Sequence, residues 1–289
     1  LARFGHRVQM VSALPDNPLG HATLEALRAQ NVDTRHIQTS AGRMGTYFLE
    51  AGAVRRPSRI VYDRANSVFA MTPAVTYDWD AILEGADWLH LSGITPAVGA
   101  DPSAAAKNAV QSARRHGVRI SFDGNYRQAL WSAWGGDGPD VLRDILNHAD
   151  TAFINERDVA LILGENFDTR EQGIKRAFSA FPALSTIACT ARAQDSVSNQ
   201  TLTGELHTRD DACISRPHDM TNIVDRIGGG DAFAAGVLHG LIGGFKPQRI
   251  IEFATAASTI KHSISGDWNL TNLAEVEEAM NESGLDVRR

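Results

Sequence analysis

The stretch 224–241, VDRIGGGDAFAAGVLHGL, places three consecutive glycines directly before an aspartate and an apolar run with helical spacing. Glycines before a helix let the backbone approach a ligand closely, and the free N–H groups of the first helical turn attract anions. Gly228, Gly229 and Gly230 therefore predict a phosphate-binding cradle. Asp231 would repel a bound phosphate, but it is suited to accept the proton of a hydroxyl that attacks it. Phosphoryl transfer needs these two parts.

Spacing alone leaves a second interpretation of this stretch open, in which the loop is structural and Asp231 caps the following helix. Two better-known glycine motifs are excluded. The stretch lacks the Lys-Ser/Thr pair of a Walker A loop, and it lacks the G-x-G-x-x-G spacing of the dinucleotide fingerprint. A phosphate cradle of another kind and a plain helix cap remain as the two alternatives.

The elements that must position these residues are short apolar strands that alternate with amphipathic helices. We expect strands at 7–14, 87–93, 118–124, 151–155 and 185–190, with helices at 17–30, 101–116 and 156–164. Asp101 is placed to cap the second of these helices and Gly117 to end it. Such alternation predicts an α/β fold with a mostly parallel sheet, helices on both faces, and ligands beyond the carboxyl ends of the strands.

Two regions depart from this alternation. Residues 45–63 consist of two strands around a polar turn, which predicts a β-hairpin outside the main sheet and suggests a lid. After residue 227 the chain becomes largely helical, with helices expected at about 229–243, 247–263 and 271–281. Because there is no internal repeat or long linker, we expect one domain over 1–289 with lid strands at about 45–64.

Composition excludes several classes of protein. The formal charge of −6 argues against a broad nucleic-acid-binding surface. No apolar run approaches the roughly 18 residues of a membrane span, and the first residues show no signal-peptide pattern. Cys189 and Cys213 form no short-spaced metal or redox pair, so we expect two buried, reduced thiols. These features favour a cytoplasmic protein that acts on small molecules.

The glycine-rich stretch resembles the second hallmark motif of the ribokinase-like (phosphofructokinase B-type) carbohydrate kinases, which is close to D-T-x-G-A-G-D-x-F-x-x-G. Arg226 replaces the usual Thr and Gly229 the usual Ala, and the matching residues are Asp225, Gly228, Gly230, Asp231, Phe233 and Gly236. Further segments resemble one branch of the family, the 2-keto-3-deoxygluconate kinases, in the expected order: 47–67, 92–97, 122–131, 155–164 and 253–269.

This resemblance implies a ribokinase-like fold with a small β-sheet lid, and it favours Asp231 as catalytic base over Asp231 as cap. The family normally carries a first strand, further lid strands and a Gly-Gly/Asn substrate motif ahead of the position that matches Leu1. The resemblance also implies a homo-oligomer, a dimer or larger, because lid sheets in this family often pair between subunits.

Several residues match positions of the family that hold the sugar. Tyr47, Tyr62 and Arg64 match lid and rim positions, and Asp267 matches a late position of the substrate pocket. Arginine can form two hydrogen bonds to one carboxylate, so Arg64 is expected to select a sugar acid. A solvated basic turn is the plain alternative for this segment. Arg127, in DGNYR, is expected to bridge the substrate and the γ-phosphate.

Other matches concern ATP and Mg²⁺. Magnesium keeps several waters and tolerates indirect ligands, so the NERD segment is expected to hold it through water; a capped helix start is the alternative there. Asn155 and Asp158 are the expected metal residues, and the expected ATP-binding residues are Asn125, Arg127, Thr190, Arg192, Ala257 and Ser258.

Together, these residues predict a kinase that moves the γ-phosphoryl group of MgATP to the 6-hydroxyl of 2-keto-3-deoxygluconate, giving 2-keto-3-deoxy-6-phosphogluconate and ADP. Two alternatives stay open at this point. One is a related kinase for fructose, ribose or 5-keto-2-deoxygluconate. The other is a non-catalytic sugar-binding regulator with the same fold, against which the intact Asp231 argues.

Overall fold

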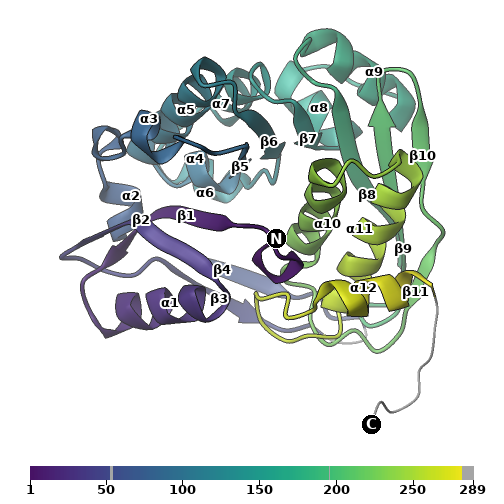
Figure 1. Cartoon of the computed structure of the whole chain (residues 1–289), viewed down its shortest axis with the longest axis horizontal. Coiled ribbons are helices and arrows are strands. Elements are labelled where there is room, and N and C mark those ends of the chain that lie inside the picture. Colours follow the sequence, from purple (N-terminus) through teal and green to yellow (C-terminus); the bar gives the residue numbers. More distant parts are fainter. Residues whose placement is uncertain (53–54, 195, 282–289) are drawn as a thin grey trace.

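The computed structural model of the chain describes residues 1–52, 55–194 and 196–281. Its main sheet is built from β5 (Trp88–Ser92), β6 (Arg119–Asp123), β7 (Thr151–Phe153), β8 (Thr186–Gln194), β9 (Gln200–Thr208), β10 (Ala212–Ile214) and β11 (His218–Met220). The order is β10-β9-β8-β7-β6-β5, and β11 also pairs with β9. The ladder from β5 to β8 is parallel, whereas β9 runs antiparallel to its neighbours. The predicted α/β fold with its largely parallel sheet is confirmed (Figure 1).

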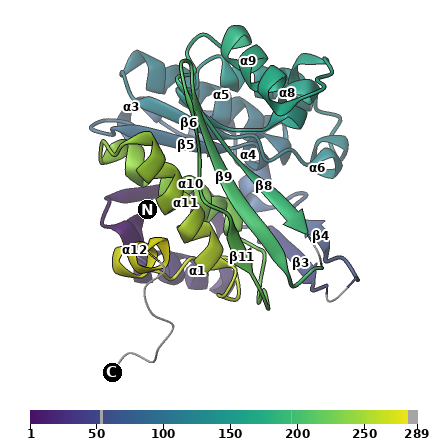
Figure 2. The ribbon, with the colours of Figure 1, turned by 90° about the vertical axis from the view of Figure 1, so that its right-hand side faces the viewer.

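Alternating side chains of these strands enter separate cores on the two faces of the sheet. Ala152 and Ile187 pack in one core with helices α5 (Ala100–Arg115) and α7 (Gly138–Leu146). Their neighbours Phe153 and Ala188 pack in the other core, with α10 (Gly229–Ile242) and α11 (Pro247–Lys261). This period of two is what a strand buried on both faces requires. The two layers of helices are visible on either side of the sheet in Figure 2.

The remaining helical segments are mostly short and complete the two layers. They are η1 (Ala2–Phe4), α1 (Pro18–Ala29), α2 (Val68–Met71), η2 (Ala74–Thr76), α3 (Trp79–Ile82), α4 (Ile94–Ala97), α6 (Gln128–Ser132), α8 (Glu156–Leu163), α9 (Arg170–Ala180) and α12 (Leu273–Met280). The expected helices at 17–30, 101–116, 156–164 and after residue 227 are confirmed to within about two residues at each end. In the ranges that the structure describes, no helix is both long and apolar enough to cross a bilayer.

The predicted cap of α5 is wrong. The helix begins one residue earlier than expected, with Gly99 at the N-cap position. Asp101 therefore lies inside the first turn, and its carboxylate accepts a hydrogen bond from the Ala74 N–H group at 3.2 Å. It ties α5 to η2 instead of capping its own helix. The end of the helix was predicted correctly, since Gly117 adopts a φ of 69° just beyond it.

The chain from 191 to 208, which includes β9, was not predicted as strand. β8 continues to Gln194, and β9 pairs with it in register over nine residues. Gln200, Leu202, Gly204 and Leu206 point inward and their neighbours outward, so the period of two is present. Only two of these four inward residues are large and apolar, which hid the pattern. The expectation of two buried thiols is also only half right, because Cys189 is buried but Cys213 is half-exposed.

Two small sheets lie beside the main one. β1 (Val8–Pro15) pairs in parallel with β2 (Val32–Ser40), and α1 forms the crossover between them. β3 (Thr46–Glu50) and β4 (Arg59–Asp63) form an antiparallel hairpin. The hairpin expected at 45–63 outside the main sheet is therefore confirmed, and Figure 2 shows it beyond the ends of β8 and β9.

Candidate active site

The glycine-rich loop opens directly into α10. Gly228 is the N-cap residue and adopts a left-handed conformation with a φ of 76°. A Cβ atom on Gly228 would lie 2.7 Å from the Asp267 carbonyl oxygen, so both the conformation and the space require glycine here. The helix begins without any side-chain cap. The N-cap residue therefore leaves the first-turn N–H groups available to an anion, apart from that of Asp231, which bonds to its own carboxylate.

The other two glycines differ in what surrounds them. A Cβ atom on Gly229 would lie 2.6 Å from Cε1 of the buried His262 ring, whereas a Cβ on Gly230 would meet no atom within 4 Å. Gly229 is therefore needed for packing and Gly230 faces open space. The all-glycine form of the loop is explained in part by the imidazole that packs against its second residue.

The loop is held from behind by α11. The Ser258 hydroxyl donates to the Gly229 carbonyl at 2.8 Å, and the His262 Nδ1 atom lies 2.7 Å from the Ser258 carbonyl oxygen. Ser258 and Ala257 are both buried, Ala257 in a core with Phe253. The structure thus places these two residues behind the cradle, and their expected contact with ATP stays a prediction.

Asp225 fastens the start of the loop to a distant segment. Its two carboxylate oxygens accept hydrogen bonds at 2.9 Å from the N–H groups of Ile227 and Gly266. Gly266 precedes Asp267, so this bridge fixes the substrate-side loop at 265–267 against the cradle. Arg226, the residue that departs from the family motif, is exposed and takes no part in the bridge.

Asp231 lies in the first turn of α10. Its side chain is exposed to solvent, but many protein atoms lie around it. Burial is the largest effect on its pKa and raises it; the nearby charge of Asp267 raises it too, while Arg127 and Lys261 oppose the shift. A carboxylate whose pKa moves up towards neutrality is a better proton acceptor than an ordinary one. The environment of Asp231 therefore suits the role of base more than that of a cap.

A third carboxylate, to which the sequence assigned no role, lies near these groups. Asp123 ends β6, and its pKa is raised to about 7 by burial and by the charges of Asp231 and Asp158. Burial is the largest cause of the raised pKa at all three carboxylates, and a bound cation would offset their negative charge. The available signal was an acid directly after the buried strand residue Phe122, at the edge where ligands bind.

A cavity of about 270 Å³ lies at this edge of the sheet and is lined by Asp123 and Asp158, and by Gly230 beside Asp231. Its lining brings together predicted residues from strands, helix starts and the loops between them, namely Asn125, Arg127, Asn155, Asp158, Thr190 and Gly230, together with Asp123 and Cys189. Asn125 adopts a φ of 35° and donates its amide to the Ser92 hydroxyl at 3.0 Å. This strained, anchored residue is typical of a ligand-binding position.

Arg192 was expected beside ATP, but it lies outside the lining of that cavity. Its guanidinium contacts the His262 Nε2 atom at 3.2 Å and the Gln200 side chain at 3.3 Å. Burial, with the charge of Arg226, lowers the pKa of Arg192 to about 10. Thr190, two residues earlier on β8, does line the cavity, so the structure separates the two residues.

The expected metal residues Asn155 and Asp158 form the N-terminal cap of α8, which was the alternative interpretation of this segment. The Asn155 side chain accepts from the N–H groups of Arg157 and Asp158, and Asp158 Oδ2 accepts from the Asn155 N–H at 2.9 Å. These bonds leave Asp158 Oδ1 for another partner, and the Asp123 carboxylate has a hydrogen bond with the Asn125 backbone. Burial raises the pKa of Asp158. The carboxylates therefore fit Mg²⁺ bound with several waters, whereas Asn155 is occupied as a cap.

The hairpin residues lie beside Asp267, whose charge also acts on Asp231. The Tyr47 hydroxyl donates to Asp267, and the Arg64 guanidinium lies 5.8 Å from the Tyr47 ring centre and 5.1 Å from that of Tyr62. Burial between these rings lowers the pKa of Arg64, which still leaves it a cation. The four substrate residues expected on the lid and rim thus lie together, with a partly desolvated guanidinium at their centre.

Comparison with known proteins agrees with this geometry. Residues 1–270 match the model of the pfkB family carbohydrate kinases. A 2-dehydro-3-deoxygalactonokinase of Haloferax volcanii is 28% identical over 99% of this chain and 86% of its own. The structure of a 2-dehydro-3-deoxygluconokinase from Thermotoga maritima is 34% identical, with a TM-score of 0.91 over 97% of this chain and 86% of the other. A ribokinase II from E. coli in complex with ATP and Mg²⁺ shares the fold, with 20% identity and a TM-score of 0.81 over 97% of this chain and 85% of the other. The chain therefore belongs to the pfkB family of carbohydrate kinases.

Proposed function

We propose that this kinase transfers the γ-phosphoryl group of ATP to the 6-hydroxyl of 2-keto-3-deoxygluconate, also called 2-dehydro-3-deoxygluconate. The observation that carries this proposal is Arg64, a guanidinium held between Tyr47 and Tyr62 on the hairpin. A partly desolvated arginine is suited to bind the carboxylate of a sugar acid at two points. The relative from Thermotoga maritima, which carries the name of this activity, supports the proposal.

The proposed roles follow from what each residue contacts. Asp231, with its raised pKa, accepts the proton of the sugar hydroxyl as that oxygen attacks. The amides of Gly228, Gly229 and Gly230 stabilise the charge of the transferred group, because they lie at an uncapped helix start. Arg127, which lines the cavity and acts on Asp231, bridges substrate and γ-phosphate.

Magnesium and ATP would be held in the cavity beside the cradle, and the sugar at the hairpin. Mg²⁺ bound there neutralises phosphate charge, and we assign it to Asp158 and Asp123, with Asn155 acting through water. For ATP we assign Asn125 and Thr190 to the phosphates. Arg192, Ala257 and Ser258 were also predicted to bind ATP, but they do not line this cavity.

Residues 1–289 serve in this proposal as one kinase unit, and the hairpin at 45–64 is its lid. The lid excludes water from the reacting phosphate when sugar binds, as closing segments do in other kinases. We also propose that the protein is cytoplasmic and assembles as a dimer or larger homo-oligomer through this lid. Sugar acid and ATP are its expected small-molecule partners.

A second candidate substrate differs only at one hydroxyl. The relative from Haloferax volcanii is a 2-dehydro-3-deoxygalactonokinase, whose substrate name denotes the galactonate instead of the gluconate. Both acids carry the same carboxylate for Arg64. The hypothesis about the sugar-acid class therefore rests on Arg64, while the choice between the two sugars is a separate question for experiment.

The test is an ADP-release assay with both keto acids, 5-keto-2-deoxygluconate, fructose and ribose. We expect the keto acids to give the largest kcat/KM. Arg64→Ala should reduce kcat/KM for the acids roughly tenfold to a hundredfold, the value of one charged hydrogen-bonded contact, and leave fructose unaffected. Arg59→Ala, which removes an exposed arginine of the same hairpin, is the matched control.

Two results would overturn the proposal in different ways. A neutral sugar that outcompetes both acids would contradict the role of Arg64. Sugar binding without phosphorylation at saturating MgATP would instead favour a regulator.

A further inference from the structure

Three side chains on the sheet, Cys189, Glu205 and His207, have the chemistry of metal ligands and lie close together; we call them the β8–β9 triad. Among the residues that the structure describes, their ligand atoms all lie within 4.8 Å of one another. Glu205 Oε2 lies 3.1 Å from His207 Nε2. The ligand atoms of a tetrahedral Zn²⁺ are about 3.3–3.8 Å apart, as bond lengths of about 2.0–2.3 Å require. Shifts of about 1 Å would therefore bring the triad into this geometry.

The pairing of β8 with β9 brings the triad together. Cys189 lies directly opposite Glu205 in the antiparallel ladder. Glu205 and His207 are two residues apart on β9, so their side chains leave the strand on the same face. Cys189 is buried, and the other two side chains are each only 15% exposed. The sheet thus holds three donors close together and largely out of water, as a preorganised metal site requires.

A neighbouring arginine orients the carboxylate of the triad. Arg170, at the start of α9, donates to Glu205 Oε1 and also to Glu156 at 3.0 Å. Glu205 Oε2 is left on the side of His207. The hydrogen bond with His207 and the charge of Arg170 lower the pKa of Glu205, so this group is ionised. Carboxylates that bind a metal usually carry such an additional hydrogen bond.

The charges around Cys189 would be balanced by a divalent cation. Burial, with the charge of Glu205, raises the pKa of the Cys189 thiol to about 12, so it is not an activated nucleophile. A metal would bind it as the thiolate and displace its proton. That thiolate would join the carboxylates of Glu156 and Glu205 beside the single positive charge of Arg170. A divalent cation offsets this excess of negative charge.

The donor set also selects the kind of ion. Thiolate, imidazole and carboxylate together suit Zn²⁺, whereas Mg²⁺ takes oxygen ligands. Three protein ligands leave one tetrahedral position to water, so the ion would be exchangeable. Cys189 also lines the active-site cavity, which gives an ion a path to the triad from solvent.

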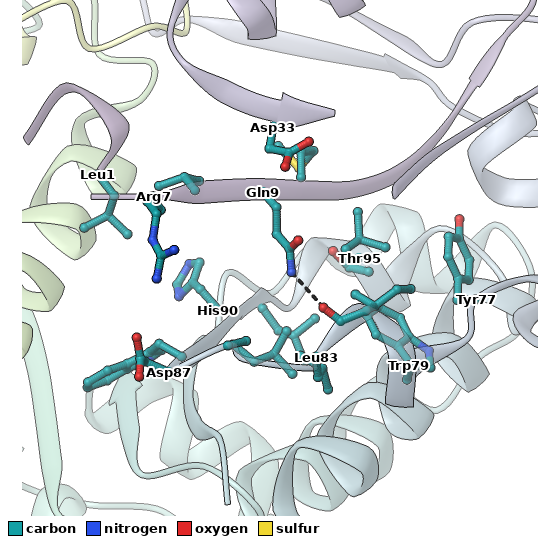
Figure 3. A pocket seen from close by; sticks show the side chains of 18 of the residues that line it. Leu1, Arg7, Gln9, Asp33, Tyr77, Trp79, Leu83, Asp87, His90 and Thr95 are labelled. Carbon is teal, nitrogen blue, oxygen red and sulfur yellow. Dashed lines mark hydrogen bonds between the residues drawn. The ribbon is translucent and has the colours of Figure 1, made fainter. Parts of the chain in front are cut away.

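A second cavity shows that titratable side chains alone do not make such a site. It has a volume of about 760 Å³ and lies between β1 and β5. Figure 3 shows that Asp33, Asp87 and His90 lie at separate points around it. Within the described part of the chain, these side chains form no group close enough to hold one ion. The convergence of three unlike donors distinguishes the triad.

We propose that Cys189, Glu205 and His207 bind one Zn²⁺ ion, with water in the fourth position. The site is separate from the carboxylates assigned to Mg²⁺. It depends neither on the proposed sugar nor on the proposed transfer of phosphate.

The test is a titration of the whole chain, freed of metal with a chelator, in buffer that contains millimolar Mg²⁺. Co²⁺ alone is the probe, because a thiolate ligand gives it a charge-transfer band in the near ultraviolet and tetrahedral geometry gives it strong visible bands. Both bands should grow and saturate at one ion per chain. Zn²⁺ should then remove them at equal concentration, since it binds such donors more tightly than Co²⁺.

Three variants each remove one ligand. Cys189→Ser should abolish the charge-transfer band, and Glu205→Gln and His207→Gln should each lower the Co²⁺ affinity at least tenfold. A purely structural role of these residues would change the melting temperature but produce no thiolate band in the wild type. The melting temperature of each variant without metal identifies those that are folded, and one folded variant is enough for the comparison.

Cys213→Ser is the matched control, because Cys213 lies on β10 outside the triad and is half-exposed. It should keep both the band and the affinity. The proposal is overturned if the wild type gives no charge-transfer band, if Cys213→Ser loses the band, or if a folded ligand variant binds Co²⁺ as tightly as the wild type.

Discussion

The cradle and the lid are built in opposite ways, although both face the reacting hydroxyl in the proposed mechanism. The cradle is backed by α11, where Ser258 and His262 are only 1% and 2% exposed. The lid is a hairpin of two five-residue strands on which Phe48 and Val61 are 61% and 63% exposed. A two-stranded hairpin is marginally stable alone, whereas a helix start held by a packed neighbour is rigid.

This difference separates two tasks. Transition-state charge and proton transfer need groups fixed to within a fraction of an ångström, and the buried side of the site supplies these. Substrate choice and exclusion of water need a part that can move, and in the proposed mechanism the exposed hairpin is that part. Changes to the cradle should therefore alter kcat and folding stability, while changes to the lid should alter substrate selection and assembly.

The largest expected effect is on the cradle side, at Asp231. Asp231→Asn removes the proton acceptor but keeps the shape, so kcat should fall about 10³-fold while ATP affinity stays unchanged. Steady-state kinetics and nucleotide binding by calorimetry measure the two quantities. A mutant that keeps more than about a tenth of the wild-type kcat would contradict the assignment of Asp231 as base.

The second prediction concerns the folding stability that is lost by burying the Asp123 carboxylate. The pKa of Asp123 is raised to about 7, so the folded state keeps a proton that the unfolded state has lost at intermediate pH. Stability therefore falls as the pH rises from about 4 to about 7, and the loss is complete above 7. Asp123→Asn should stabilise the protein by an amount that grows over this window to the order of 2–4 kcal/mol.

Urea unfolding of wild type and Asp123→Asn at a series of pH values measures this effect. Asp80 is a control with the opposite sign, because hydrogen bonds from Ser112, Arg115 and His116 lower its pKa to about 2. Its contribution is present above the ordinary pKa of an aspartate and lost as the pH falls towards 2. Asp80→Asn should therefore destabilise the protein at neutral pH. A difference between wild type and Asp123→Asn that does not vary between pH 4 and pH 7 would refute the prediction.

The third prediction distinguishes two of the three glycines of the cradle, Gly229 and Gly230. Gly229→Ala places a Cβ atom 2.6 Å from the His262 ring and should cost about 1–3 kcal/mol of folding stability. Gly230→Ala meets no atom within 4 Å and should change stability by less than about 0.5 kcal/mol. Adding His262→Ala to Gly229→Ala should recover part of the loss in a double-mutant cycle. Equal destabilisation by the two alanines would show that contact with His262 does not explain the loop.

The cradle and the lid also differ in how far the sequence predicts them. The glycines and Asp231 are adjacent in sequence, and spacing alone narrows their role to a phosphate cradle or a helix cap. The hairpin at 45–63 was visible as two strands without a helix between them. Contacts between distant segments gave no such signal: the ring of His262 behind Gly229 and the tie from Asp225 to Gly266 appear only once the chain is folded.

Other misses have local physical reasons. β9 alternates inward and outward residues, but Gln200 and Gly204 occupy two of its inward positions and conceal the pattern. Gly204 is small because a Cβ there would lie 2.2 Å from the Thr255 hydroxyl of α11. Asp101 looked like a cap because the helix start was placed one residue late. Asp123 received no role from the sequence because the carboxylates near it, Asp158 and Asp231, come from the starts of two distant helices.

The smallest effect on stability is expected on the lid. Phe48 and Val61 lie opposite each other across the hairpin, and both are exposed. Exposed apolar pairs of this kind are suited to an interface between subunits. Phe48→Glu combined with Val61→Glu should convert the proposed oligomer to a monomer and change the free energy of unfolding of the subunit by less than about 0.5 kcal/mol.

Sedimentation equilibrium of wild type and double mutant measures this change in mass. Val75→Glu is the matched control, because Val75 is 90% exposed on η2 and far in sequence from the hairpin. It should leave the mass unchanged. A wild type that sediments as a monomer would remove the proposed role of the lid in assembly. A double mutant that stays oligomeric would place the interface elsewhere, and the lid would then differ from the cradle only in its effect on substrate choice.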